Sequence, residues 1–114
     1  MITIYHNPRC KKSRAGLEFL SNKTKDFEIK EYLKNDAFSF ESLKETLQLL
    51  GKKPMEMIRK QEASYKKEIK EKEFTDDELI QLMVENPKLI NRPIIIKDGK
   101  AVWGEPAENI EDLF

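Results

Sequence analysis

Residues 2–14 read ITIYHNPRCKKSR, and they predict a strand, a tight loop and the start of a helix. Its first four residues are β-branched or aromatic and predict a buried strand over residues 2–5. Asn7-Pro8 ends that strand, and a helical stripe of apolar residues follows Cys10 and runs to residues 21–23. The order of strand, tight loop and helix places the single cysteine of the chain at the start of a helix.

Later stretches complete a sheet around this first strand. Residues 27–30 alternate in period two, extend to Leu33, and predict a second, parallel strand reached by a right-handed crossover. Residues 94–103, with an Asp98-Gly99 turn, predict a β-hairpin. The hairpin strand that follows Pro93 is expected to pair beside the first strand. The sequence predicts an α/β, thioredoxin-like fold: a four-stranded mixed sheet flanked by helices.

The middle of the chain predicts a helical insertion. Ser39 is a candidate N-cap for a helix whose Leu43, Leu47 and Leu50 share one face, and Gly51 ends it. Three further stretches are expected to be helical: residues 54–74, 75–86 and 106–114. A chain of 114 residues fits one domain, so residues 1–114 are expected to form a single domain.

The composition excludes several classes of function. The 21 basic and 21 acidic residues cancel, so no net charge attracts the protein to nucleic acid or to a membrane surface. The longest apolar run, residues 94–96, is too short to cross a bilayer, and the first residues lack the pattern of a signal peptide. One cysteine allows no intrachain disulfide. These features predict a cytoplasmic protein without a nucleic-acid or membrane partner.

Cys10 is the strongest candidate for chemistry. A thiol at a helix N-terminus faces the positive end of the helix dipole and unpaired N–H groups. Arg9, Lys11, Lys12 and Arg14 add positive charge, and such surroundings lower a thiol pKa toward the ~3.5–7.5 range of reactive cysteines. The same N–H groups can hold an anion, so the loop suits attack of a thiolate on an oxyanion. A lone cysteine is more often a core residue, but charged neighbours oppose that interpretation here.

Arginine is rare in this lysine-rich chain, which has 17 Lys and 4 Arg. The guanidinium presents a rigid fork of donors that suits oxyanions better than an ammonium does. The four arginines are Arg9, Arg14, Arg59 and Arg92. Arg92 precedes Pro93, and a proline before a strand can mark a cis peptide bond at the entrance to a site. Residue chemistry alone leaves alternatives open: Arg59 and Arg92 as surface charges, and His6 as an ordinary loop residue.

The whole chain resembles the arsenate reductase family of the glutaredoxin-linked, ArsC type, which also contains the Spx-type regulators. Three stretches carry the resemblance: ITIYHNPRCKKSR (2–14), IRKQEASYK (58–66) and FTDDELIQLMVENPKLINRPIII (74–96). The resemblance implies two sets of site residues: the catalytic residues Cys10, His6 and Ser13, and the substrate-binding residues Arg14, Arg59, Arg92 and Pro93. In the first set Cys10 is the nucleophile, and His6 and Ser13 lower the pKa of its thiol.

The activity that this resemblance implies is that of an oxidoreductase reducing arsenate to arsenite. The Cys10 thiolate attacks arsenate, glutathione is the co-substrate, and glutaredoxin resolves the mixed disulfide, with no tightly bound cofactor and no metal. Residues 10–13 read C-x-x-S, so the resolving thiol has to come from outside this chain. Two alternatives stay open: an Spx-type regulator that binds RNA polymerase, and a monothiol oxidoreductase with another substrate.

The chain departs from the family pattern at Glu105. The family has a third substrate-binding arginine before a proline that follows the last strand, whereas this chain has Glu105 before Pro106. The local charge changes by two units against an anion, each worth ~3 kcal/mol at ~6 Å and an effective dielectric of ~20 before screening. If Glu105 reaches the Cys10 loop, it is expected to weaken arsenate binding and to raise the pKa of the thiol.

Overall fold

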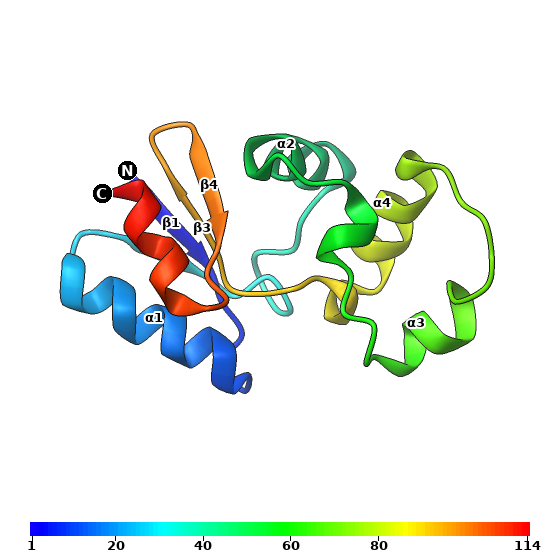
Figure 1. The fold of residues 1–114 in the computed structure, drawn as a ribbon, viewed down its shortest axis with the longest axis horizontal. Coiled ribbons are helices and arrows are strands. Elements are labelled where there is room, and N and C mark those ends of the chain that lie inside the picture. The colour runs from blue at the N-terminus through cyan, green and yellow to red at the C-terminus, as the bar shows by residue number, and fades with distance from the viewer. The chain divides into compact units, whose positions relative to one another are not determined.

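The sheet is built around the first strand, as the opening sequence predicts. The computed structural model describes residues 1–114, and its four-stranded sheet has the order β2-β1-β3-β4 (Figure 1). The strands are β1 (Ile2–Tyr5), β2 (Glu28–Lys30), β3 (Ile94–Lys97) and β4 (Lys100–Trp103). β1 pairs in parallel with β2, while the pairs β1–β3 and β3–β4 are antiparallel. The predicted mixed sheet flanked by helices is confirmed.

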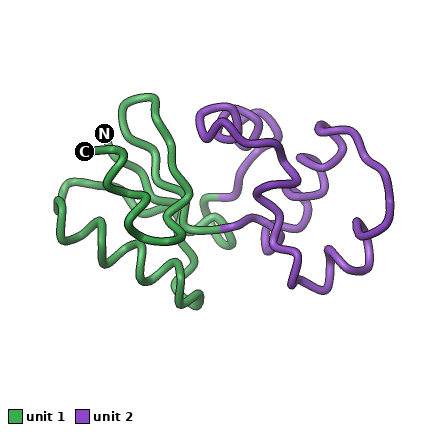
Figure 2. The backbone as a smooth tube through the Cα atoms, viewed as in Figure 1, with its two compact units in different colours: residues 1–36, 92–114 green, residues 37–91 purple.

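The chain forms two compact units (Figure 2). Unit 1 contains Met1–Asp36 and Arg92–Phe114, and it holds the whole sheet. Unit 2 contains Ala37–Asn91 and is the helical insertion that the middle of the sequence predicts. That residues 1–114 act as a single domain stays a prediction.

The core of unit 1 lies between the sheet and two helices, α1 (Lys11–Lys23) and the 3-10 helix η3 (Ala107–Leu113). The two helices lie side by side, η3 in red, in Figure 1. The buried residues of this core are Ile2, Ile4, Leu20, Ile95, Ile110 and Leu113. Each fully buried side chain of this size contributes roughly 1.5–3 kcal/mol. The core therefore fixes α1 on the sheet, and with it the residue at the helix N-terminus.

Two elements of unit 1 differ from their predicted form. The second strand ends at Lys30, because the backbone turns there and Lys34 N–H donates to Glu31 C=O at 3.0 Å. Tyr32 is still buried, which is why the apolar alternation continues beyond the strand. The last helix is a 3-10 helix with Pro106 as its N-cap residue.

The helices of unit 2 are α2 (Phe40–Leu50), η1 (Pro54–Met57), α3 (Ala63–Glu68), α4 (Asp76–Glu85) and η2 (Pro87–Leu89). The helices α2 and α4 begin and end close to the predicted residues, whereas the expected helical stretch 54–74 is helical only at 54–57 and 63–68, and the short helix at 87–89 was not predicted. Ser39 caps α2, and Gly51 ends it at a φ of 66°, a left-handed conformation that favours glycine. No helix in either unit combines the length and the apolar character needed to cross a membrane.

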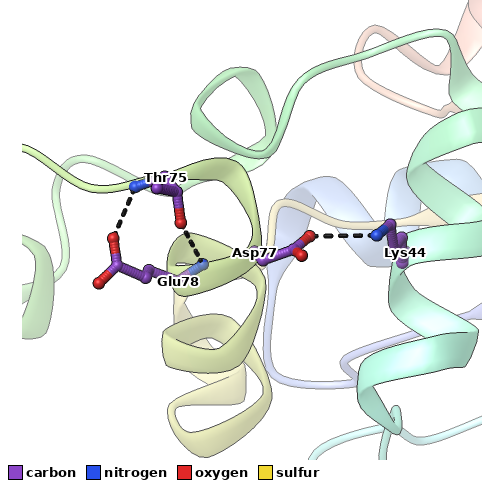
Figure 3. A network of polar contacts seen from close by, with 4 residues as sticks. All are labelled: Lys44, Thr75, Asp77 and Glu78. Carbon is purple, nitrogen blue, oxygen red and sulfur yellow. Dashed lines mark hydrogen bonds and ion pairs between the residues drawn. The ribbon is translucent and has the colours of Figure 1, made fainter.

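The start of α4 is fixed by a capping box (Figure 3). Thr75 Oγ1 accepts a hydrogen bond from Glu78 N–H at 3.2 Å, and Glu78 Oε1 accepts one from Thr75 N–H at 2.8 Å. Beside it, Lys44 Nζ of α2 lies 3.2 Å from Asp77 Oδ1. This ion pair is largely exposed, so it adds at most about 1 kcal/mol, and the capping box is the stronger local determinant of the helix start.

Candidate active site

The loop between β1 and α1 is held by hydrogen bonds among its own residues. Asn7 C=O accepts a hydrogen bond from Cys10 N–H, and Asn7 Oδ1 accepts one from Arg9 N–H, each at 3.0 Å. The Arg14 guanidinium donates to Pro8 C=O at 3.0 Å. This turn makes Cys10 the N-cap residue of α1, and its C=O accepts from Arg14 N–H at 2.9 Å. The cysteine lies at the start of a helix, as the sequence predicts.

His6 and Ser13 form the buried base of this loop. His6 Nδ1 lies 2.7 Å from Ser13 Oγ, and Ser13 Oγ also accepts from Asn7 N–H at 3.0 Å. Burial lowers the pKa of His6 below its ordinary value of 6.5, against opposing effects of Glu31 and of the Ser13 backbone. His6 is therefore neutral at pH 7, and it shapes the loop without bringing a positive charge to the thiol.

The Cys10 thiol is half-buried, and its surroundings favour the thiolate. Burial raises the pKa of the thiol, but hydrogen bonds from Ser13 N–H, the Arg92 side chain and Lys12 N–H lower it, as does the charge of Arg92. The net result is a lowered pKa, in the direction that the sequence predicts. Ser13 acts on the sulfur through its backbone, whereas its hydroxyl is engaged by His6 and Asn7.

Arg92 and Pro93 stand at the entrance to β3, and their peptide bond is cis, as predicted. The Arg92 side chain is buried and reaches Cys10. Two hydrogen bonds hold this backbone to the residues that end and follow β4: Gly104 N–H donates to Pro93 C=O at 2.9 Å, and Trp103 Nε1–H donates to Arg92 C=O at 3.4 Å. The fold thus brings a guanidinium from the second half of the chain to the sulfur.

The other two predicted arginines have different surroundings. Arg14 is exposed in unit 1, where its guanidinium closes the loop through Pro8. Arg59 lies in unit 2 and is half-buried, with Nε 3.4 Å from Glu62 Oε2 and its N–H donating to Leu89 C=O at 2.7 Å. Their roles in substrate binding stay predictions.

Glu105 follows β4 in unit 1 and is half-buried. Its C=O accepts from Asn109 Nδ2 at 3.2 Å, and its peptide bond with Pro106 is cis. Glu105 is not among the groups that act on the pKa of Cys10. An effect of this carboxylate on an anionic substrate stays a prediction.

Sequence reasoning missed three residues that organise this site, Asn7, Gly16 and Gly104. Asn7 was interpreted only as the end of a strand, although an Asn-Pro pair is a signal for a loop whose side chain bonds its own backbone. Gly16 lies inside a helix, where glycine costs about 1 kcal/mol relative to alanine. That cost indicates a packing requirement, which the structure locates at Pro93.

Comparison with known proteins gives the family. A family model described as the ArsC family matches residues 5–113. This chain belongs to the ArsC family. It is 36% identical over 115 residues to an arsenate reductase of Neisseria meningitidis serogroup A, covering 99% of this chain and 97% of that one. It is 38% identical over 114 residues to an Escherichia coli K12 protein named uncharacterized protein YfgD, covering 98% of this chain and 95% of that one.

Among solved structures, an arsenate reductase from Vibrio cholerae superposes on this ArsC-family chain with a TM-score of 0.92. The two are 37% identical, over 99% of this chain and 97% of that one. This likeness confirms the thioredoxin-like fold predicted for the chain. Within the ArsC-family chain, no group of three or more His, Cys, Asp or Glu side chains could hold a metal ion.

The contribution of Arg92 to the thiol can be measured directly, because Cys10 is the only cysteine of the ArsC-family chain. Arg92→Gln removes a hydrogen bond and a positive charge from the thiolate, so the pKa of Cys10 should rise. Alkylation by iodoacetamide, followed across pH, should slow by about threefold or more below the wild-type midpoint. Arg9→Gln is the matched control: Arg9 is exposed, so the alkylation profile of this variant should keep the wild-type midpoint. An unshifted profile for Arg92→Gln contradicts the assignment.

The stability of the ArsC-family chain should depend on His6 between pH 7 and pH 5.5. The pKa of His6 is lowered on folding, so the folded protein binds a proton less readily than the unfolded chain does. The contribution of His6 to the free energy of unfolding is therefore fully present above pH 6.5 and is lost as the pH falls through the pKa of the folded state. Urea midpoints should therefore fall over this range in the wild type and less in His6→Gln. His6 is the only histidine, so no other imidazole contributes. Equal slopes for both proteins would show that His6 is not protonated on unfolding.

Proposed function

We propose that this chain is an oxidoreductase that reduces arsenate to arsenite with Cys10 as its nucleophile. The single observation that carries the proposal is the Cys10 thiol at the N-terminus of α1, with its pKa lowered by the Arg92 guanidinium and by backbone N–H groups. Membership of the ArsC family supports an oxyanion substrate, because relatives in that family are named arsenate reductases. A thiolate with donors around it suits attack on an oxyanion.

The chemistry follows in three steps. The Cys10 thiolate attacks arsenic(V), a sulfur–arsenic bond forms, and one arsenate oxygen leaves as water after protonation. A glutathione thiolate then attacks the Cys10 sulfur, the sulfur–arsenic bond breaks, and arsenic keeps the bonding pair. Arsenic is reduced from the (V) to the (III) state, and the two sulfurs are oxidised to a mixed disulfide between Cys10 and glutathione. A glutaredoxin thiolate then attacks the glutathione sulfur of that disulfide, forms a disulfide with glutathione and releases the Cys10 thiolate.

External thiols are required because Cys10 is the only cysteine of this chain. The hydroxyl of Ser13 cannot replace a second thiol, since an alcohol forms no disulfide. Glutathione and glutaredoxin are the proposed donors, and the cytoplasm is the proposed location, because both the thiolate and its donors need a reducing compartment. No tightly bound cofactor takes part in this scheme.

The proposed oxyanion site uses guanidinium groups and the backbone at the start of α1. Arg92 neutralises the Cys10 thiolate before attack, and its fork of donors suits a tetrahedral oxygen once the sulfur has bonded to arsenic. Arg59 and Arg14 are proposed to bind further oxygens of the substrate, and Pro93 to line the site beside Arg92. His6 and Ser13 are proposed to hold the loop in which Cys10 reacts.

The central test is the loss of the thiol. With glutathione, glutaredoxin and arsenate, Cys10→Ser should form arsenite only at the background rate, because serine cannot supply a thiolate. Turnover that survives Cys10→Ser contradicts the proposal. A wild type that acts only on a glutathionylated peptide points instead to a monothiol oxidoreductase.

The proposed role of Arg59 has a separate test. Arg59→Gln should raise the KM for arsenate by about tenfold, the cost of one charge-assisted hydrogen bond. Lys60→Gln, which removes the neighbouring exposed charge, should leave the KM unchanged.

Glu105→Arg tests whether the carboxylate weakens arsenate binding. A guanidinium in its place should lower the KM for arsenate by about tenfold at low salt, and less at high salt, since the site must be open to solvent to admit its substrate. The pH profile of Cys10 alkylation should not move, because Glu105 is not among the groups that shift the pKa of Cys10. Glu108→Arg makes the same charge change at an exposed position of η3 and is the control. Equal effects of both variants would indicate general electrostatic attraction and no contact at position 105.

A further inference from the structure

The ring of Pro93 is packed between two glycines. A Cβ at Gly16 of α1 would lie 2.5 Å from Pro93 Cγ, and a Cβ at Gly104 would lie 3.0 Å from the same atom. Carbon atoms in contact are normally ~3.5–4.0 Å apart, so neither position has room for a methyl group while the ring stays in place. All three residues are buried.

This contact links the helix that begins after Cys10 to the residue next to Arg92. Gly16 lies in the same helix as Cys10, about 9 Å further along its axis at 1.5 Å per residue. Arg92 is bonded directly to Pro93, and both backbones are held to Trp103 and Gly104 by hydrogen bonds. A change in the distance between α1 and Pro93 therefore changes the distance between the Cys10 sulfur and the Arg92 side chain.

We propose that Gly16 and Gly104 are positioning residues for the reaction of Cys10, which hold the Pro93 ring between them and so set the place of Arg92 beside the sulfur. Their part in catalysis rests on the proposed function, whereas their effect on the thiol does not. The two positions are not equal. At Gly16 the obstacle is the proline ring itself, while at Gly104 the nearest atom is Cδ1 of Ile95, at 2.9 Å, the end of a flexible side chain.

The groups near Cys10 differ in whether they change the pKa of its thiol. Arg92 is the charged side chain that acts on its pKa, and Lys12 acts through its backbone N–H. The exposed cations of the loop and first turn are Arg9, Lys11, Lys12 and Arg14, and His6 is buried and neutral. The atoms nearest to a Cβ at Gly16 belong to Pro93 and Gly104, and those nearest to a Cβ at Gly104 belong to Ile95, Pro93 and Ile110. Alanine at either glycine is therefore expected to affect the thiol through Pro93 and Arg92.

The experiment compares alanine at three glycines by the pH profile of iodoacetamide alkylation. Gly16→Ala should move the profile to higher pH and slow alkylation by about threefold or more below the wild-type midpoint, and Gly104→Ala should do so less. Gly51→Ala is the control: it has a φ of 66° and nothing within 4 Å of its Cβ, so it should lower stability and leave the profile in place. In an Arg92→Gln background the effect of Gly16→Ala should disappear.

Several results would overturn the proposal. Alanine is a better helix former than glycine, so a Gly16→Ala protein with a higher melting temperature and an unmoved profile would show that the methyl group fits. An equal effect of Gly16→Ala with and without Arg92 would show a route that bypasses Arg92. If Gly16→Ala does not fold, Gly104→Ala alone and with Arg92→Gln decides in the same way. Alkylation needs no arsenate, so failure of arsenate reduction in the wild type overturns the proposed function and leaves this result standing.

Discussion

The contact between the Cys10 sulfur and the Arg92 guanidinium depends on how unit 1 is folded. Cys10 follows β1, Arg92 precedes β3, and these two strands pair at the centre of the sheet. Burial alone would protonate the thiol, so the lowered pKa shows that the donors outweigh the burial. One pKa unit corresponds to ~1.36 kcal/mol of differential interaction between thiolate and thiol, so a displacement of Arg92 that weakens its interaction with the sulfur raises the pKa of Cys10. The reactivity of the cysteine is therefore a property of the sheet as well as of the loop.

The cations on either side of Cys10 have a weaker effect on the thiol than the sequence alone suggests. Arg9, Lys11 and Lys12 are exposed and form no salt bridge. Water and salt screen charges in such positions, whereas the buried Arg92 guanidinium acts at close range with little solvent between. The flanking cations can still attract an anionic substrate or thiol from a distance, an effect that falls with ionic strength. Long-range attraction and thiolate stabilisation are thus carried by different residues.

The sequence predicts the features that depend on local pattern. Neighbouring residues alone predict β1, the Asp98-Gly99 turn with its φ values of 49° and 78°, and the capping residues of α2. The predicted end of β2 is wrong because Tyr32 is buried in a turn, and the period-two pattern cannot distinguish such a turn from a strand. The meeting of Cys10 with Arg92 came from the family resemblance, since no local rule joins residues so far apart in the chain. The packing of Gly16 on Pro93 is tertiary, and only its cost to the helix was visible beforehand.

The hydrogen bonds of the Ser13 hydroxyl favour a serine over a second cysteine at position 13. The Ser13 hydroxyl accepts from Asn7 N–H and bonds His6 Nδ1 in a place with no exposure to solvent. A thiol is a weak donor and a weak acceptor, so a cysteine at this position would leave two buried partners poorly satisfied. The backbone N–H of the same residue meanwhile stabilises the Cys10 thiolate. Position 13 therefore supports the loop with its side chain and the Cys10 thiolate with its backbone, and in the proposed reaction the resolving thiol comes from outside this chain.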